Sequence, residues 1–100
     1  HQARAVTLRA KLAAAGLPVM MCESHIVPVF VGDPVICKQV SDDLLNDHDI
    51  YVQPINYPTV PRGTERLRFT PCPVHTDDMM DDLVRALDVV WTRRKIRRAA

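Results

Sequence analysis

The apolar residues of this chain alternate between helical and strand spacing, and the order of those segments constrains the fold more than any other feature. The segments with helical spacing are 2–15, a stretch from Asp33 to about Asp47, and a stretch that begins at Thr76. The segments with strand character are 26–32, 50–55 and 66–71. The order is helix, strand, helix, strand, strand, helix within 100 residues, which is the size of one domain. We predict an α/β fold over residues 1–100, with a small antiparallel or mixed sheet of about three strands packed with helices.

Turn and cap residues support these boundaries. Gly16 suits the position after a helix, and Asp33, followed by a proline, is typical of a helix N-cap. Thr76 is a candidate N-cap for the last helix. Because Pro28 has no amide hydrogen, its strand is expected at an edge of the sheet or at a bulge. The apolar stripe of the last helix is predicted to be Met80, Leu83, Val84, Leu87 and Trp91.

The composition argues against several classes of partner. The net charge of +1 and the aromatic content of 5% argue against a nucleic-acid partner. No apolar run is long enough to span a bilayer, so no membrane partner is expected. Cys22, Cys37 and Cys72 are odd in number and lack CxxC spacing, which argues against a disulfide framework and a zinc site and favours a reducing compartment. The chain starts without Met inside a helical pattern, so we expect a fragment of a longer protein.

The loop 56–65 and the strand after it carry the candidate site. Pro58 and Pro61 restrict the loop backbone, which suits either a rigid connector or a preorganised binding segment. In the strand, alternation separates the apolar pair Leu67 and Phe69 from Arg68 and its polar neighbours. An exposed arginine often belongs to a solvated face, but in a cleft its planar guanidinium can grip both oxygens of a carboxylate.

Other polar residues suggest no reaction centre. Lys11, Lys38 and Lys95 lie on predicted helices in polar surroundings, so none suits a Schiff base, and no Gly-rich phosphate loop is present. Any cofactor is therefore expected to be anchored elsewhere in a longer chain. The basic cluster 93–98 is interpreted as a solvated helix end that complements the helix dipole.

The histidines and one cysteine receive structural interpretations. His25, His48 and His75 flank strands, loops or a helix end and are expected to have structural roles, so no metal site is predicted. Cys72, followed by a proline, has a context that some haem-regulated proteins use for a thiolate ligand; the dipeptide alone favours an ordinary loop cysteine.

Several segments together resemble the C-terminal end of the 5-aminolevulinate synthase family. The most specific is 50–63, with the sequence IYVQPINYPTVPRG; shorter matches are 16–19, 24–29, 66–68 and 75–76. The resemblance runs from about His1 to Trp91, nearly the whole chain. It implies the C-terminal small domain of a fold-type I pyridoxal-phosphate enzyme, with the large domain that binds the cofactor absent from this segment.

The resemblance also implies a reaction. The family condenses glycine with succinyl-CoA to 5-aminolevulinate, CO2 and free coenzyme A, the first step of one route to haem and other tetrapyrroles. Its members are homodimers with active sites at the subunit interface. No position here matches the family's catalytic or cofactor-binding residues, so this segment alone is expected to be inactive.

Three positions of this sequence match the family's binding residues. Arg68 matches the arginine that holds the amino-acid carboxylate, which makes its strand face a cleft rather than a solvated surface. Thr59 matches a threonine on the succinyl-CoA side of the site. Arg62 matches a basic position with either a binding or a structural role.

Two alternatives stay open at this point. A sister α-oxoamine synthase, such as 2-amino-3-ketobutyrate ligase, 8-amino-7-oxononanoate synthase or serine palmitoyltransferase, would keep Arg68 and use another acyl-CoA or amino acid. A free-standing, non-catalytic α/β binding module is the second alternative. If Ala100 is the true terminus, the chain lacks the C-terminal extension of animal members, which favours a bacterial cytoplasmic enzyme over one of the mitochondrial matrix.

Overall fold

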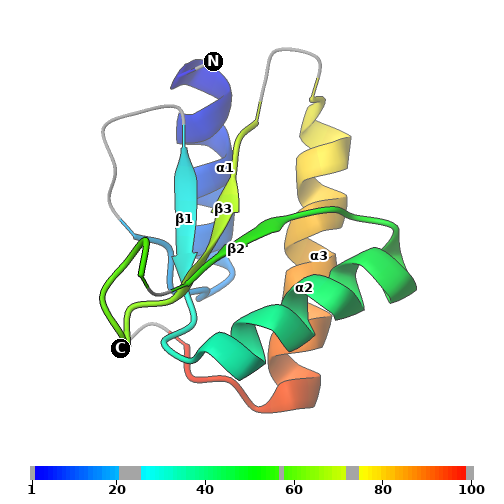
Figure 1. Cartoon of the computed structure of the whole chain (residues 1–100). Coiled ribbons are helices and arrows are strands. Elements are labelled where there is room, and N and C mark those ends of the chain that lie inside the picture. The colour runs from blue at the N-terminus through cyan, green and yellow to red at the C-terminus, as the bar shows by residue number, and fades with distance from the viewer. Residues whose placement is uncertain (1, 21–25, 57, 72–74, 99–100) are drawn as a thin grey trace.

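Six elements follow one another in the predicted order (Figure 1). The computed structural model describes residues 2–20, 26–56, 58–71 and 75–98. The elements are α1 (Gln2–Ala14), β1 (Val27–Phe30), α2 (Pro34–His48), β2 (Gln53–Ile55), β3 (Arg66–Phe69) and α3 (Asp77–Arg94). The order helix, strand, helix, strand, strand, helix is therefore confirmed.

The three strands form one antiparallel sheet in the order β1-β3-β2. Of the two predicted alternatives, antiparallel and mixed, the antiparallel sheet is the one observed. Each strand is shorter than predicted, because the hydrogen-bonded pairing between strands stops before the predicted boundaries. Gly32, for example, has a φ of 86° and turns the backbone into α2 after β1 has ended at Phe30.

Pro28 lies on an edge strand, as expected. Its carbonyl oxygen accepts a hydrogen bond from the Met20 amide at 2.8 Å, on the side of β1 that faces away from β3. The amide and carbonyl of one strand residue point to the same side, so the missing amide hydrogen removes no bond to β3.

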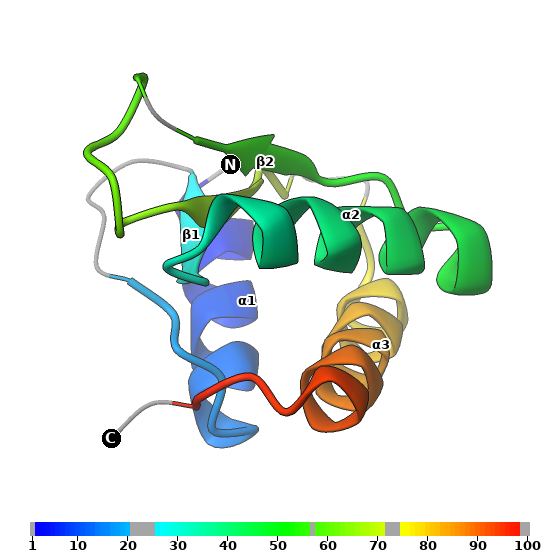
Figure 2. The same ribbon diagram turned by 60° about the horizontal axis from the view of Figure 1, so that its bottom comes forward.

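All three helices contribute to a single core on one face of the sheet (Figure 2). α1 buries Ala5, Leu8 and Leu12, which lie three and four residues apart along the helix. The core residues from the sheet and from the other helices are Val27, Val29, Leu67, Phe69, Cys37, Val40, Leu44, Met80, Ala86, Leu87, Val90 and Trp91. Of the stripe predicted for α3, Leu83 and Val84 are only partly buried and pack against this core.

Helix caps fix the entry of the chain into α2 and α3. The Asp33 side chain accepts hydrogen bonds from the amides of Val35 at 2.9 Å and Ile36 at 3.0 Å. The Thr76 hydroxyl accepts from the Met79 amide at 3.1 Å. Both predicted N-caps are confirmed, and each satisfies amides that have no partner within the helix.

Candidate functional site

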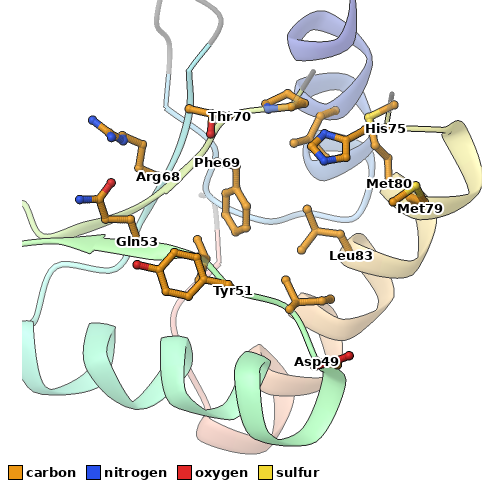
Figure 3. A pocket seen from close by; sticks show the side chains of 14 residues that line it. Asp49, Tyr51, Gln53, Arg68, Phe69, Thr70, His75, Met79, Met80 and Leu83 are labelled. Atoms are coloured by element: carbon orange, nitrogen blue, oxygen red, sulfur yellow. The ribbon is translucent and has the colours of Figure 1, made fainter. Parts of the chain in front are cut away.

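The site is built around Arg68, in the middle strand of the sheet. Its neighbours Leu67 and Phe69 are buried in the core, so strand alternation directs Arg68 to the opposite, exposed face. The antiparallel register places Gln53 of β2 directly across from Arg68. The two side chains extend to the same side, away from Met79 and Leu83 of α3 (Figure 3).

The Arg68 guanidinium differs from most other arginines of the described residues in its contacts. Arg4, Arg94 and Arg98 each form an ion pair with an aspartate. Arg66 donates a hydrogen bond from Nε to the Thr64 carbonyl oxygen at 3.0 Å. Within the described residues, the Arg68 side chain has no hydrogen bond or ion pair, so its donors are available to an anion outside this chain.

A cavity of about 420 Å³ adjoins Arg68. It lies between the residues that enter β2, the end of β3 and the first turns of α3 (Figure 3). Most of its lining is apolar and includes Leu8, Tyr51, Phe69, Met79, Met80 and Leu83. Arg68 and Gln53 belong to the lining as well, and their side chains extend away from the apolar part (Figure 3). The cavity therefore combines an apolar wall with a cation at one side.

Thr59 and Arg62 lie on the loop between β2 and β3, and both are exposed. The Thr59 amide donates to the Asn56 carbonyl oxygen at 3.0 Å, which closes a turn at the start of this loop. Neither residue lines the cavity beside Arg68. Within one chain, the structure therefore does not bring the three predicted binding residues together.

Each lysine of the chain has a structural setting. Lys11 forms an ion pair with Asp81 at 2.8 Å, and that bond raises the pKa of the lysine. Lys38 pairs with Asp42 at 2.9 Å on the surface of α2. Lys95 is exposed at the left-handed residue that ends α3, with a φ of 56°. None is a buried amine, so these lysines do not fit covalent attachment of a cofactor.

Metal-ligand and membrane-spanning features are not found among the described residues. No group of three or more His, Cys, Asp or Glu side chains there could hold a metal ion. No helix in that part of the chain is long and apolar enough to cross a membrane. His25 and Cys72, which the sequence analysis singled out, lie outside the described residues.

Cys37 is a free and buried cysteine on α2. Its Sγ donates to the Arg66 carbonyl oxygen at 3.4 Å. Burial raises the pKa of the Cys37 thiol to about 11, so the reactive thiolate is scarce at neutral pH. The residue packs in the core and is not a candidate nucleophile.

The basic cluster 93–98 is largely exposed at the end of α3, as expected, and two of its arginines also bond to α2. Arg94 donates from Nη2 to Asp43 at 2.9 Å and from Nη1 to Gln39 at 3.0 Å, both on α2. Arg93 pairs with Asp47 of the same helix at 3.0 Å. Arg93 and Arg94 join the end of α3 to α2, because α2 places acidic side chains opposite these two arginines.

The sequence analysis missed two residues near the candidate site. Gln53 stands across from Arg68 only because of the strand register, which no local signal in the sequence fixes. Glu65 comes directly before β3 and is buried, although glutamate usually lies at the surface. The one signal in the sequence that could have pointed to Glu65 was its position between two segments with strand character.

The chain is similar to proteins of one family along nearly its whole length. Residues 1–87 match the family described as aminotransferase class I and II. The chain is 60% identical over 99 residues to 5-aminolevulinate synthase 1 of Cereibacter sphaeroides, covering 99% of this chain and 24% of that protein. It is 55% identical over 89 residues to a mitochondrial 5-aminolevulinate synthase of Neurospora crassa, covering 89% of this chain and 14% of that protein. The chain thus spans about a quarter of the length of its bacterial relative.

Solved structures share the fold. A serine palmitoyltransferase from S. paucimobilis, described with a bound PLP–myriocin aldimine, has a TM-score of 0.80 and 26% identity, covering 92% of this chain and 23% of that one. Serine palmitoyltransferase of Sphingomonas wittichii has a TM-score of 0.83 at 20% identity, covering 96% and 25%, and bears on the fold alone. The predicted fold class, an α/β unit of fold-type I pyridoxal-phosphate enzymes, is confirmed. With residues 1–87 matched and the same fold in solved relatives, the chain belongs to the aminotransferase class I and II family.

Proposed function

We propose that this chain is the C-terminal small domain of a 5-aminolevulinate synthase. The observation that carries the proposal is the 60% identity over 99 residues to a protein of that name. Identity to the serine palmitoyltransferase from S. paucimobilis is only 26%, although the fold is the same. The parent protein would condense glycine with succinyl-CoA to 5-aminolevulinate, CO2 and free coenzyme A.

The reaction requires pyridoxal phosphate, and the lysines of this segment do not suit its attachment. Pyridoxal phosphate, when bound, acts as an electron sink for the bond cleavages at the amino-acid Cα. The settings of Lys11, Lys38 and Lys95 do not suit its attachment. We therefore assign cofactor binding to the remainder of the longer polypeptide, and no catalytic residue to this segment.

We assign to Arg68 the binding of the glycine carboxylate. Its backbone is held in the middle strand by β1 on one side and β2 on the other, so the guanidinium projects from a rigid base. A planar guanidinium matches both carboxylate oxygens with two parallel charge-assisted bonds. That grip fixes the direction of the Cα–H bond and contributes through positioning.

We assign Thr59 and Arg62 to the succinyl-CoA side. The Thr59 hydroxyl would hydrogen-bond the succinyl carboxylate, and Arg62 would add positive charge on the same loop. These residues lie away from the cavity beside Arg68 within one chain. A homodimer with active sites between its subunits is an arrangement that would let both sets of residues contact substrate.

A sister α-oxoamine synthase activity is the second candidate. The structural likeness to serine palmitoyltransferase, with a TM-score of 0.80, supports it. Such an enzyme would use the same carboxylate contact and a different acyl-CoA. The bacterial relative at 60% identity favours a bacterial cytoplasmic enzyme, with the mitochondrial matrix as the alternative in view of the Neurospora crassa relative at 55%.

The deciding experiment is an assay of the full-length parent with pyridoxal phosphate, glycine and a panel of acyl-CoAs. Release of coenzyme A and formation of the aminoketone are measured together. A strong preference for succinyl-CoA is expected. Preference for acetyl-, pimeloyl- or palmitoyl-thioesters would assign the protein to a sister activity, and no turnover with any of them would favour a binding module.

A further inference from the structure

Glu65 is a buried carboxylate at the end of the loop that carries Thr59 and Arg62. Its exposed fraction is 1%, and it is the one charged side chain that is buried within the described residues. Removing a carboxylate from water is unfavourable unless hydrogen bonds replace its hydration. The burial of Glu65 next to a proposed binding loop therefore requires hydrogen bonds that compensate for its lost hydration.

Glu65 accepts hydrogen bonds both within this loop, through its side chain, and from the turn between β1 and α2, through its backbone carbonyl. Its Oε1 accepts from the Gly63 amide at 3.1 Å, inside the loop. Its carbonyl oxygen accepts from the amides of Val31 at 2.9 Å and Gly32 at 2.8 Å. One residue thus connects the loop, the start of β3 and the turn after β1.

The two glycines in these contacts permit a close approach of the two segments. Gly32 has a φ of 86° and Gly63 a φ of 84°, in the region that favours glycine. A Cβ added to Gly32 would lie 2.9 Å from the Phe30 ring and 3.5 Å from the Gly63 carbonyl oxygen. A side chain at Gly32 would therefore be strained by the backbone and crowded by Phe30, at ordinary contact distance from the loop end.

We propose that Glu65 is a positioning residue that holds the loop of Thr59 and Arg62 in the conformation that binds the acyl-CoA. The proposal rests on the assignment of that loop to the acyl-CoA side. Glu65 does not contact substrate itself; its carboxylate acts through the Gly63 amide, and its backbone carbonyl anchors the loop end to the β1–α2 turn. Arg68 is held independently, because its backbone is paired to both β1 and β2. Loss of the Glu65 carboxylate should therefore impair acyl-CoA use more than glycine use.

The test compares Glu65→Ala and Glu65→Gln in the full-length parent. We expect Glu65→Ala to raise the KM for succinyl-CoA about tenfold and to leave the KM for glycine within about twofold. Glu65→Gln should stay near the parent, because its amide oxygen can still accept from Gly63. Asp82→Ala, which removes an exposed carboxylate from α3, is the matched control. Equal effects on both substrates, or a Gln variant as impaired as the Ala variant, would overturn the proposal.

Hydrogen exchange separates this proposal from the proposed reaction. In the Glu65→Ala enzyme, peptides that cover 58–64 should exchange faster than in the parent, whichever acyl-CoA the enzyme uses. If the parent does not use succinyl-CoA but the Glu65→Ala variant still exchanges faster than the parent, the positioning role is kept and the proposed substrate is refuted. Unchanged exchange would refute the positioning role even if succinyl-CoA is the substrate.

A substitution on the other side of the contact guards against poor folding of the first variant. Gly32→Ala strains the left-handed backbone and crowds the Phe30 ring, and so displaces the Gly32 amide that bonds to the Glu65 carbonyl oxygen. It should give the same split between the two KM values and faster exchange in 58–64. A Gly32→Ala enzyme with parental KM values for both substrates would count against the proposal.

Discussion

At the scale of single residues, two arginines on this chain show how context sets the role of a side chain. Arg94 uses its guanidinium inside the fold, in bonds to Asp43 and Gln39. Arg68 projects from the middle of the sheet and makes no such bond with the described residues. The difference comes from what lies opposite each side chain: an acidic helix for Arg94 and the open sheet face for Arg68.

We predict that Arg68→Leu in the full-length parent sharply lowers kcat/KM for glycine. Truncation of a charge-assisted pair typically costs about 2–5 kcal/mol, and the glycine carboxylate would lose its partner. Arg68→Lys should recover only part of the loss, because an ammonium cannot form the two parallel bonds. Steady-state kinetics with glycine varied checks the prediction, and parental glycine kinetics in both variants would remove Arg68 from the site.

Thr59→Ala is expected to affect the other substrate. Removal of one hydroxyl hydrogen bond should raise the KM for succinyl-CoA by about 5- to 10-fold, equivalent to about 1 kcal/mol or slightly more. Thr59→Ser, which keeps the hydroxyl, is the control. Kinetics with each substrate varied in turn distinguishes the two binding sites. An effect confined to the KM for glycine would contradict the assignment of Thr59 to the succinyl-CoA side.

At the scale of the elements, α2 and α3 are joined by more than core packing. Asp43 of α2 has a side chain that is only 15% exposed, and it accepts hydrogen bonds from Arg94. The bond from Arg94, with a further contribution from Arg93, lowers the pKa of the Asp43 carboxyl. The charged form of Asp43 therefore stabilises the packing of the two helices.

We predict that Asp43→Asn lowers the free energy of unfolding of the chain by about 1–2 kcal/mol at pH 7. Because the folded-state pKa of Asp43 is lowered, its contribution is present above the unfolded pKa of about 3.9 and is lost as the pH falls through the folded value. The parent and the variant should therefore converge in acid. Urea unfolding at pH 7 and pH 3 measures this.

Asp82→Asn serves as the control for Asp43. Its partner Arg85 is close along α3, and both side chains are largely exposed. An exposed pair of this kind contributes less than about 1 kcal/mol. A difference between parent and Asp43→Asn that stays constant down to pH 3 would show that the carboxylate charge is not the source of the stabilisation.

At the scale of the whole molecule, the helices cover one face of the sheet and leave the face that carries Arg68 and Gln53 without a helix over it (Figure 2). The cavity beside Arg68 also opens between apolar side chains, of which Tyr51 and Met79 are largely exposed. Exposed apolar surface of this kind attracts hydrophobic dyes and promotes association. A chain that spans about a quarter of its relatives would show such surface when it is produced alone.

We predict that the 100-residue chain binds a hydrophobic dye such as anilinonaphthalene sulfonate and self-associates. Replacing both Tyr51 and Met79 by Ser should reduce dye fluorescence. Val35→Ser, which removes an exposed apolar side chain that does not line the cavity, should not. Dye titration and light scattering measure both properties, and a monodisperse chain that binds no dye would favour a free-standing module.

The sequence by itself determined the features that depend on neighbours along the chain. Helical spacing, the caps at Asp33 and Thr76, and the alternation around Arg68 all act over a few residues, so each could be predicted and each was found. The family resemblance, strongest in 50–63, added the expected role of Arg68. Local physics does not supply that role, because an exposed arginine often belongs to a solvated face.

The tertiary structure alone decided the contacts between distant segments. The strand order β1-β3-β2 set Gln53 opposite Arg68, and packing buried Glu65 against the β1–α2 turn. Arg94 meets Asp43 across 51 positions of sequence, so the bonds between the basic cluster and α2 could not be predicted from the sequence. Such pairs depend on register and on how helices pack, and no local pattern encodes either, because many pairings bury the same apolar residues.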